Sequence, residues 1–387
     1  MNILIYLEGE SARIMRVEQM PSQAFSRPLK VRMAVRQERT DFDSWVEAAL
    51  RSTQPPDWLV GDAPYHEFVV SSRARIMRNL RDLPFPHLAS AGELEEVRRR
   101  VEAAASGLMA LDSMSLPERA LLVGSRLVAP DFPFGQRGRT LLMDRSRTVS
   151  VMVNEEDHLR IQAVTGGLSL ETAWTAVAVM ESRLASSLSW KTDEGGAYLA
   201  SSPPNSGAGY RLSVLLHLPG LAASGTAEAE ALLLESEGLE IRGVLGERTR
   251  AVGAYVQVGT TRRTAGELTE AVRHLMNKER QARIQLLDGR ADRAISTAIS
   301  TVGSSDGLNV AAAVRCLSWL RLGSLLGMVA RPQRDLDALM ALICFGEADE
   351  PTANLRRAHL MRRFLDMKLD WIPTETKMGS KSIRYSD

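Results

Sequence analysis

Seven consecutive residues, Asn154 to Arg160, contain three carboxylates, a histidine and an arginine. They directly follow the apolar run Val149–Val153, whose pattern predicts a strand. Carboxylates held at the end of a strand can orient a nucleophile and accept the proton that it loses. A solvated acidic turn with a neighbouring ion pair is the alternative, so other segments of the chain must decide between the two.

Closely spaced arginines occur in the segment Val70–Leu80, which begins like a strand. Alternation along a strand would place Arg73 and Arg75 on one face, where both guanidinium groups could bind the same polyphosphate. A solvated basic edge strand explains these residues as well.

Phosphoryl transfer needs a bound triphosphate, Mg²⁺ and an aligned nucleophile. The chain contains no Walker motif and no protein-kinase set of a glycine-rich loop with His-Arg-Asp.

Two further segments place arginines beside glycines. Ala200–Arg211 contains a Ser-Ser-Pro-Pro run and two glycines that permit a close approach of the backbone. Ile241–Glu247 carries an arginine and a glutamate around two glycines, which suits a loop that closes over a substrate and excludes water. Each of these segments alone is weak evidence for a functional site. Their order and spacing along the chain make the whole set informative.

Together the four segments resemble the active site of the ATP:guanidino phosphotransferases, in particular the bacterial protein-arginine kinase branch. The resemblance extends over about residues 57–370 and includes Leu83–His87 and Arg315–Gly323. Kinases of free guanidino compounds carry a larger helical domain before the first arginine segment. The roughly 70 residues available here do not read as one, which favours a protein substrate.

The resemblance implies a role for each matching residue. Glu156 and Glu247 would hold and deprotonate the guanidinium group of the substrate, with Ser202 beside them. A guanidinium group stays protonated at physiological pH, so anions must position it. Mg²⁺ would neutralise the triphosphate, and no protein metal site is expected. The residues implied to bind ATP are Ser71, Ser72, Arg73, Arg75, Arg126, Arg160, Arg211, Leu212, Ser213, Val214, Leu215, Arg242, Gly243, Val244, Leu245 and Gly246.

The chain departs from the family's pattern at three places. The family has a cysteine at Ser202, and a neutral hydroxyl supplies no charge against a guanidinium. We therefore expect a reaction slower by about one to three orders of magnitude. Arg126 replaces a nucleotide-contacting histidine, and its plane can stack on adenine. The phosphoarginine-receptor motif Arg-Asp-x-x-Arg-Ala matches Ala353–Ala358 only at Arg357 and Ala358. We expect that site to be lost or weakened, and Arg357 to be structural.

Positioning these residues requires a mixture of strands and helices. Apolar patterns predict strands at 67–72, 140–143, 148–153, 210–216, 240–242 and 254–258. They predict helices at 41–52, 93–111 and 170–189, and a capping box at Thr264–Glu267 opens another that runs toward Leu287. Strands that do not alternate regularly with helices indicate an α+β fold with a central antiparallel sheet flanked by helices.

After Asp288 only helical patterns remain, at 290–330 and 333–370. The expected organisation is a poorly ordered extension at 1–40, a guanidino phosphotransferase catalytic domain at 41–288, an all-helical C-terminal domain at 289–372 and a frayed tail at 373–387.

The chain of 387 residues has 48 lysines and arginines against 47 aspartates and glutamates, so its global charge favours neither nucleic acid nor a membrane surface. The two cysteines, Cys316 and Cys344, have no metal-ligand spacing, as expected for buried thiols of a cytoplasmic protein. No run approaches 18 apolar residues, so no membrane span is expected.

The first hypothesis is an ATP-dependent kinase that phosphorylates arginine side chains in proteins, using ATP and Mg²⁺. A nucleotide-binding pseudokinase or adaptor, weakened by the Cys-to-Ser change at position 202, is the alternative from another class. A kinase of a free guanidino compound is the third. An activator protein and a homodimer formed through the C-terminal domain are further partners left open.

Overall fold

The computed structural model describes residues 3–8, 11–16, 55–61, 63–112, 115–243, 252–286, 289–343 and 351–366. Some predictions lie outside these residues. They concern the helix at 41–52, the tail at 373–387, Cys344 and the loop residues Val244, Leu245, Gly246 and Glu247.

The chain divides into two compact units, Met1–Ser52 and Thr53–Asp387. In the first unit, strands β1 (Ile3–Glu8) and β2 (Ser11–Arg16) pair as an antiparallel hairpin, which the sequence did not predict. The second unit holds all the predicted site residues. A domain boundary near residue 288 within it stays a prediction.

The second unit is built on an eight-stranded sheet whose neighbouring strands all run antiparallel. From one edge to the other, the strands are β4 (Met109–Leu111), β5 (Thr140–Met143), β6 (Val149–Val153), β7 (Leu159–Gly166), β3 (Val69–Arg78), β8 (Tyr210–His217), β10 (Tyr255–Thr260) and β9 (Glu240–Gly243). The predicted α+β class with a central antiparallel sheet is confirmed.

Two of these strands were not predicted. β7 begins inside the acidic run, so Arg160 stands on a strand and not in a turn. β4 falls within residues 93–111, where the prediction of one continuous helix is wrong. The helix there, α3 (Ala91–Ala104), ends before Gly107, whose φ of 93° is a left-handed conformation that helices do not continue through.

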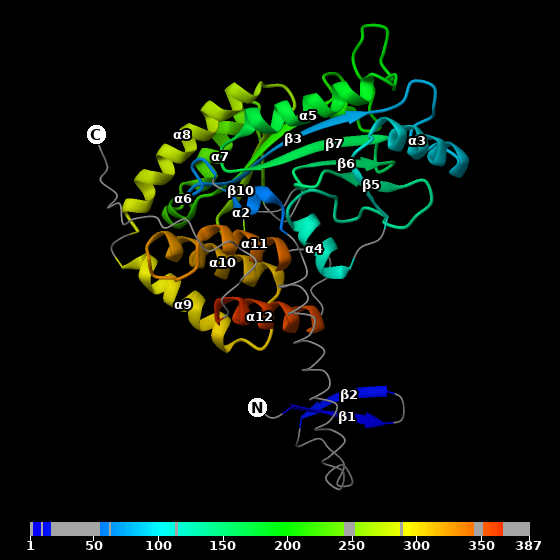
Figure 1. Ribbon diagram of the computed structural model, residues 1–387. Coiled ribbons are helices and arrows are strands. Elements are labelled where there is room, and N and C mark those ends of the chain that lie inside the picture. Colours follow the sequence, from blue (N-terminus) through cyan, green and yellow to red (C-terminus); the bar gives the residue numbers. More distant parts are fainter. Residues whose placement is uncertain are drawn as a thin grey trace. The chain divides into compact units, whose positions relative to one another are not determined.

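One face of the sheet is apolar and packs against helices. Alternate residues of the central strands, such as Ala74, Ile76, Leu212 and Val214, join a single buried core with α3, α5 (Leu170–Ala185) and α8 (Ala265–Ile284). Figure 1 shows α5 and α8 running along the sheet. α8 begins with the predicted capping box, in which Glu267 N donates to Thr264 Oγ1 at 3.3 Å and Thr264 N donates to Glu267 Oε2 at 2.7 Å.

The opposite face is covered at its β5–β6 end by α4 (Leu116–Gly124), with α2 (Asp57–Val60) nearby. Leu122 and Val123 of α4 pack there against Leu141, Met143 and Met152 of the two strands. This second apolar cluster ends at Val164 of β7. The side chains of the site lie beyond it, over β7, β3, β8, β10 and β9.

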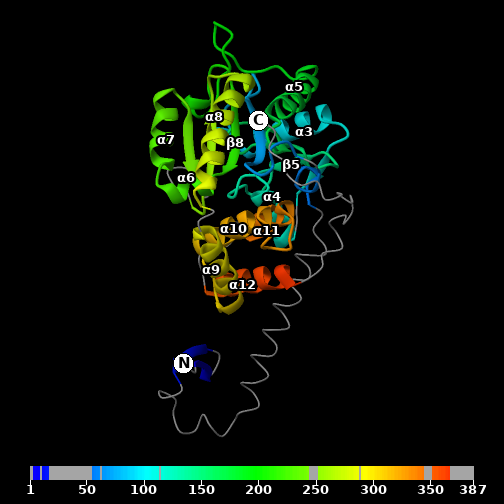
Figure 2. The same cartoon turned by 90° about the vertical axis from the view of Figure 1, so that its left-hand side faces the viewer.

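Four helices follow α8: α9 (Arg290–Ser304), α10 (Val310–Leu325), α11 (Gln333–Ile343) and α12 (Pro351–Asp366). They gather on one side of the sheet in both perpendicular views (Figures 1 and 2). Among the described residues, none after Thr260 belongs to a strand, in agreement with the predicted all-helical C-terminal region. Arg357 of α12 is buried and donates to the carbonyl oxygens of Ile343 and Leu308, as expected for a structural arginine.

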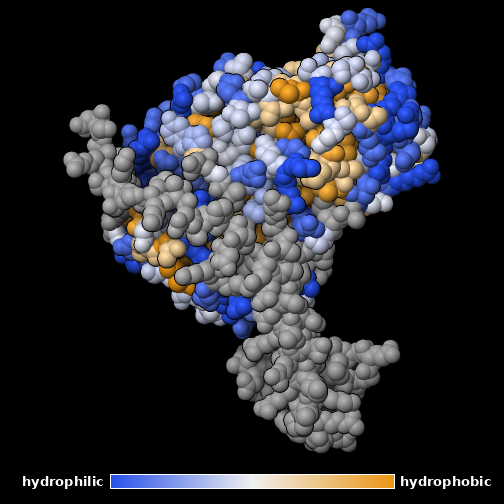
Figure 3. All heavy atoms as spheres, viewed as in Figure 1, coloured by the Kyte–Doolittle hydropathy of each residue, from blue (hydrophilic) through white to orange (hydrophobic). Residues whose placement is uncertain are grey.

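The surface seen in Figure 3 is hydrophilic over α3, where the charged side chains pair with one another. Arg98, for example, donates to Glu102 and Asp112 at 2.8 Å each. Within the described ranges, no helix has the length and apolar character needed to cross a bilayer.

Candidate active site

The register of the central strands brings the predicted arginines to one face of the sheet. Arg75 of β3 lies directly opposite Arg211 of β8, and Met77 of β3 lies opposite Arg160 of β7. Residues paired across neighbouring strands point to the same side, as do alternate residues of one strand. Arg73, Arg75, Arg160 and Arg211 therefore share a side.

The same rule adds the edge strand β9. Leu215 of β8, on the side of Arg211, lies opposite Gln257 of β10, and Gln257 lies opposite Arg242 of β9. We call this side of the sheet the arginine face. It carries five arginines from four strands: Arg73, Arg75, Arg160, Arg211 and Arg242.

Positive charge is concentrated on the arginine face. The pKa values of Arg73 and Arg75 are lowered well below the usual arginine value, first because burial removes water and then because neighbouring arginines repel the charge. Within the described part of the chain, the buried Nε atoms of both residues have no hydrogen-bond partner. Arginine keeps its charge in proteins. The face therefore suits an anion with several charges.

Arg126 contributes a sixth guanidinium group to the arginine face. It follows α4 with a φ of 63°, a left-handed conformation that is uncommon for a residue other than glycine. Its Nη1 donates to Gln257 Oε1 at 3.1 Å, and its Nη2 contacts Ser71 Oγ. Burial lowers the pKa of Arg126 to about 10. The structure thus places Arg126 beside Ser71 and among the predicted phosphate ligands.

Two residues of the arginine face were missed in the sequence. Gln257 accepts hydrogen bonds from Arg126 and, at 3.4 Å, from Arg73 Nη2. Glu240 of β9 pairs with both Arg211 and Arg242. The alternation of β9 was a usable signal for Glu240, since it stands two residues before Arg242 and must share its side. Gln257 could not be identified in this way, because its position on the arginine face depends on the pairing of β10 with β9.

Two carboxylates lie beside Arg160. Glu155 Oε2 is 2.5 Å and Glu156 Oε2 is 3.3 Å from Arg160 Nη2. The Glu155 side chain is 15% exposed and burial raises its pKa. The Glu156 side chain is 42% exposed and can meet a substrate from solvent. Glu156, the predicted catalytic carboxylate, therefore stands at the rim of the arginine face.

The acidic run is a tight loop held by buried polar contacts. Asn154 N donates to His158 O at 2.9 Å, which closes the loop. Asn154 has a φ of 56°, a conformation that asparagine tolerates better than most residues, and its Nδ2 donates to the carbonyl oxygens of Leu94 and Gly138. These contacts fix the backbone that carries Glu156.

Asn79 and Asp157 connect this loop to the segment that contains Ser202. Asn79 Oδ1 accepts from His158 N at 2.9 Å, and its Nδ2 donates to Asp157 Oδ1 at 2.7 Å. The same Asp157 oxygen accepts from Ser201 N at 2.7 Å. Glu156 and Ser202 are each one residue away from this last bond. The two predicted catalytic segments are thus brought together.

Ser202 precedes a short 3-10 turn, Pro203–Asn205. Its carbonyl oxygen accepts from Asn205 N at 2.9 Å, and its side chain is half-buried. The turn is pinned at its other end, where Ser206 Oγ accepts from Ala200 N at 3.1 Å. The hydroxyl of Ser202 therefore stands on a loop that backbone and side-chain hydrogen bonds hold in shape.

Some predicted ATP-binding side chains do not reach the arginine face. Leu212 and Val214 belong to the apolar core on the other side, while Ser213 and Leu215, which alternate with them, share the side of Arg211. Ser72 also points away, and its Oγ donates to Gly167 O at 2.8 Å. Because side chains alternate along a strand, only Ser213 and Leu215 of this predicted run have side chains on the arginine face.

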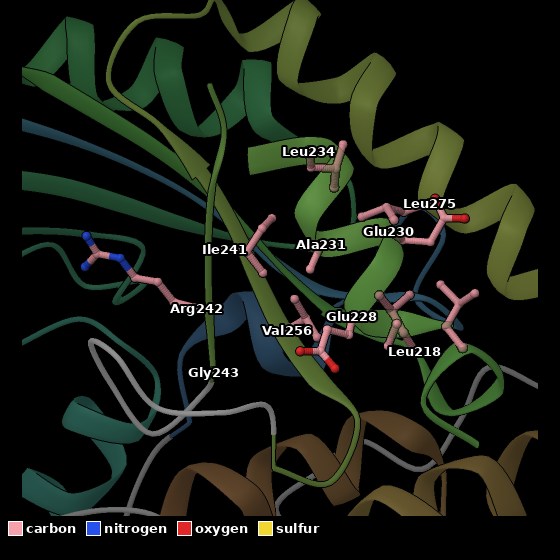
Figure 4. Close-up of a pocket in the computed structure, with 12 residues that line it drawn as sticks. Leu218, Glu228, Glu230, Ala231, Leu234, Ile241, Arg242, Gly243, Val256 and Leu275 are labelled. Atoms are coloured by element: carbon pink, nitrogen blue, oxygen red, sulfur yellow. The ribbon is translucent and has the colours of Figure 1, made fainter. Parts of the chain in front are cut away.

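A cavity of about 380 Å³ lies on the far side of β9 from the arginine face. α6 (Pro219–Ser224), α7 (Ala227–Ser236) and α8 surround it. Ile241 points into this cavity, while Arg242, the next residue, points away from it (Figure 4). Gly243, predicted to contact the nucleotide, lines this cavity at the end of β9. The cavity is largely apolar, and neither Glu156 nor Ser202 lines it.

Comparisons with known proteins point in the same direction. The profile of the ATP:guanido phosphotransferase C-terminal catalytic domain matches residues 94–282. A protein-arginine kinase of Pelotomaculum thermopropionicum is 34% identical over 310 residues, which cover 74% of this chain and 86% of that protein. A protein-arginine kinase of Halothermothrix orenii is 30% identical over 337 residues, which cover 80% of this chain and 96% of that protein. The similarity to the solved structure of a lombricine kinase is weaker, with 22% identity, a TM-score of 0.48 and coverage of 64% of this chain and 77% of the other.

A sheet face lined with arginines and rimmed by carboxylates suits a protein that transfers phosphoryl groups. The chain belongs to the ATP:guanido phosphotransferase family, a family of enzymes.

Proposed function

We propose that this chain is an ATP-dependent kinase that phosphorylates arginine side chains in proteins. The observation that carries the proposal is the arginine face, where five guanidinium groups from four strands share one side of the sheet and Glu156 stands at its rim. Several relatives bear the name protein-arginine kinase, which supports a guanidinium group in a protein as the phosphate acceptor.

ATP would lie on the arginine face with its phosphates against Arg73, Arg75, Arg160, Arg211 and Arg242. Arg126 would bind beside them, next to Ser71 and Gln257. Guanidinium groups bind phosphate oxygens through paired N–H donors, so several of them fix both the position and the charge of a triphosphate. The loop residues Val244, Leu245 and Gly246 are proposed to close over it.

Mg²⁺ takes most of its ligands from water and from the phosphates of the nucleotide. Within the described residues, no cluster of three or more metal-ligating side chains occurs, and Glu155 and Glu156 are carboxylates beside Arg160. This donor set fits a magnesium ion that arrives with ATP. The ion would neutralise part of the phosphate charge.

In the proposed reaction, a nitrogen of the substrate guanidinium attacks the γ-phosphorus of ATP. The N–P bond forms while the bond to the leaving ADP oxygen breaks, and the proton lost from nitrogen passes to Glu156. Glu156 and Glu247 would hold the guanidinium in line. Ser202 would accept a hydrogen bond without adding charge, so the step would be slower than with a thiolate.

Ser202 also favours a second candidate, a nucleotide-binding pseudokinase that acts as an adaptor. Such a protein would bind ATP on the arginine face without transferring phosphate. A kinase of a free guanidino compound differs from both in its acceptor. One assay separates the three.

The test incubates the purified full chain with ATP, Mg²⁺ and an unfolded arginine-rich protein, and measures acid-labile phosphate on that protein. Parallel reactions contain free arginine or creatine as acceptors. We expect labelling of the protein acceptor, an increase of about 10- to 1,000-fold in Ser202→Cys, and a loss of activity in Glu156→Gln.

Two further variants tie the activity to the arginine face. Arg75→Lys keeps the charge but loses the planar two-donor geometry, so ATP affinity should fall by about 10-fold or more. Arg273→Lys, an exposed position paired with Glu270, is the matched control and should behave like the unmodified protein. Absence of labelling in both the unmodified protein and Ser202→Cys, with nucleotide binding intact, would favour the pseudokinase. Labelling of small acceptors alone would favour the third candidate.

The setting of this activity is also a proposal. We place the protein in the cytoplasm, acting on proteins with exposed arginines and requiring neither nucleic acid nor a membrane. An activator protein, and a homodimer formed through α9–α12, remain predictions. Chemical cross-linking of the purified chain, with and without substrate protein, tests whether the homodimer forms.

A further inference from the structure

Glu240 is a carboxylate at the β9 edge of the arginine face. It begins the edge strand β9, and its register with Gly259 of β10 and then Ser213 of β8 places it on the side of Arg73. Its Oε2 accepts from Arg242 Nη2 at 2.9 Å and also contacts Arg211 Nη2. The side chain is 35% exposed, so a solute can reach it.

The ion pairs of Glu240 involve Arg211 and Arg242, two of the arginines that are proposed to bind the phosphates of ATP. A carboxylate oxygen held between two guanidinium groups makes the same charge-assisted hydrogen bonds that a phosphate oxygen would make. Arg211 is only 9% exposed and Arg242 is 25% exposed, so the carboxylate lies where solvent screening is incomplete. A phosphate that approaches these arginines meets a fixed negative charge.

The centre of the arginine face differs from its two edges, because carboxylates contact the arginines at both edges. Arg160 is paired with Glu155 and Glu156 at the opposite edge of the site. Between these two edges, Arg73 donates to the neutral amide oxygen of Gln257, and burial and neighbouring positive charge lower the pKa values of Arg73 and Arg75. The centre of the face, at Arg73 and Arg75, is therefore open to an anion, whereas Arg211 and Arg242 already bind the carboxylate of Glu240.

We infer that Glu240 is a specificity-determining residue of the nucleotide site, an internal counterion that holds Arg211 and Arg242 until a ligand with several phosphates displaces it. The inference rests on the proposed binding of ATP to this face. A ligand with little charge cannot compensate for breaking the two contacts, whereas a triphosphate replaces them and gains Arg73 and Arg75 as well. Glu240 thus lowers the affinity for every phosphate-bearing ligand and makes the site depend on a high phosphate charge.

The alternative is that Glu240 only stabilises the edge strand. Backbone pairing holds β9 to β10 from Glu240 to Gly243 without help from the side chain. Glu240→Gln keeps the size of the side chain and an acceptor oxygen, and removes the charge. It therefore separates the electrostatic role from the packing role.

The experiment measures binding of ATP, ADP and adenosine by calorimetry to the unmodified full chain and to Glu240→Gln. Glu237→Gln is the matched control, because Glu237 is exposed, pairs with Arg263 at 3.7 Å and gives the same change in net charge. We expect ATP affinity to rise about 10-fold in Glu240→Gln, equivalent to ~1.4 kcal/mol, and to be unchanged in Glu237→Gln. Adenosine, which has no phosphate, should bind all three proteins equally.

High salt screens the charge of Glu240, so the gain in Glu240→Gln should shrink as ionic strength rises. Equal ATP affinity in Glu240→Gln and the unmodified protein, a similar gain in Glu237→Gln, or a gain for adenosine overturns the inference. If Glu240→Gln fails to fold, Glu240→Val makes the same measurement possible. If no form of the protein binds ATP, the proposed function fails; if ATP binds without the gain, only the role of Glu240 fails.

Discussion

Neighbouring side chains in the run Asn154–Arg160 have different surroundings, and this division follows from burial. Glu156 is 42% exposed, whereas Asp157 and His158 are 1% and 0% exposed. His158 Nδ1 accepts from Leu80 N at 3.0 Å, so the ring is neutral, and its Nε2 donates to Pro84 O at 2.8 Å. Burial lowers the pKa of His158 to about 4. The exposed residue is available for chemistry and the buried ones hold it in place.

His158 should make the fold sensitive to mild acid. Its pKa of about 4 in the folded protein lies below the usual value near 6.5 for an unfolded chain. Below pH 6.5 the unfolded chain therefore takes up a proton that the folded protein does not, and stability falls until pH 4. Between pH 7 and 5 this one residue should account for a loss of about 2 kcal/mol in the free energy of unfolding.

Urea unfolding at pH 7 and at pH 5 measures this effect. In His158→Asn, which keeps an acceptor for Leu80 N but cannot be protonated, the difference between the two pH values should be smaller by that amount. His217 is buried and its pKa is lowered well below its usual value, so it also reduces stability at acid pH. This effect is the same in the unmodified protein and in His158→Asn. An equal pH dependence of the two proteins would contradict the assignment of His158.

At the scale of elements, strands carry the arginines of the site and loops carry the predicted catalytic side chains that the structure describes. β3, β7 and β8 at the centre of the sheet carry four of the arginines, and their positions are set by backbone pairing. Glu156 and Ser202 stand on two loops instead, and those loops are joined through Asp157 and Asn79. Binding of the phosphates and alignment of the acceptor should therefore respond differently to mutation.

Asp157→Ala should reduce kcat far more than ATP affinity. Without Asp157, Ser201 N loses its acceptor, and the direct bond between the Ser202 loop and the Glu156 loop is lost, although Asn79 still contacts both. A misplacement of about 1 Å costs about 100-fold in rate, so we expect kcat to fall by about 10- to 100-fold and ATP affinity to change by less than about 3-fold. Steady-state kinetics and calorimetry on the same preparation give both values.

Asp193→Ala is the matched control, because Asp193 accepts from Ala197 N at 2.9 Å in an exposed turn of the same segment. Its kcat should equal that of the unmodified protein. Parallel losses of kcat and ATP affinity in Asp157→Ala would mean that the whole site, and not the alignment of the loops, depends on this residue.

At the scale of the molecule, a buried polar network joins the C-terminal helices to the sheet. Arg321 of α10 and Asp337 of α11 are 0% and 2% exposed and pair at 2.8 Å. Arg321 also donates to His66 O at 2.6 Å and contacts His217 Nδ1 at 3.3 Å, at the far end of the strand that carries Arg211. The helices α10 and α11 are thus tied to the strand that begins in the arginine face.

Arg321→Met should destabilise the protein strongly, because it leaves the Asp337 carboxylate buried without its main partner. Breaking one side of a buried pair typically costs about 3–5 kcal/mol, whereas an exposed pair contributes about 0–1 kcal/mol. Arg273→Met, which removes the exposed partner of Glu270, is the control and should change the urea midpoint little. The double variant Arg321→Met with Asp337→Leu should recover part of the loss, and a double variant less stable than the single one would contradict this account.

The amino-acid sequence by itself determined the local chemistry. The segments around Arg73, Glu156, Ser202 and Arg242 were recognisable in order, the capping box of α8 was visible at Thr264, and the strand and helix patterns gave the α+β class. These features depend on residues close together in the chain, where spacing alone fixes what shares a face.

Only the tertiary structure decided which of these residues meet. Pairing of β3 with β8 sets Arg75 opposite Arg211, and pairing of β10 with β9 brings Gln257 and Glu240 among the arginines. Register between strands is fixed by burial of one sheet face along the whole sheet, and a one-residue slip would turn every side chain to the other side. That long-range constraint placed Leu212 and Val214 in the core, Asp157 between two loops, and the charge of Glu240 against Arg211 and Arg242.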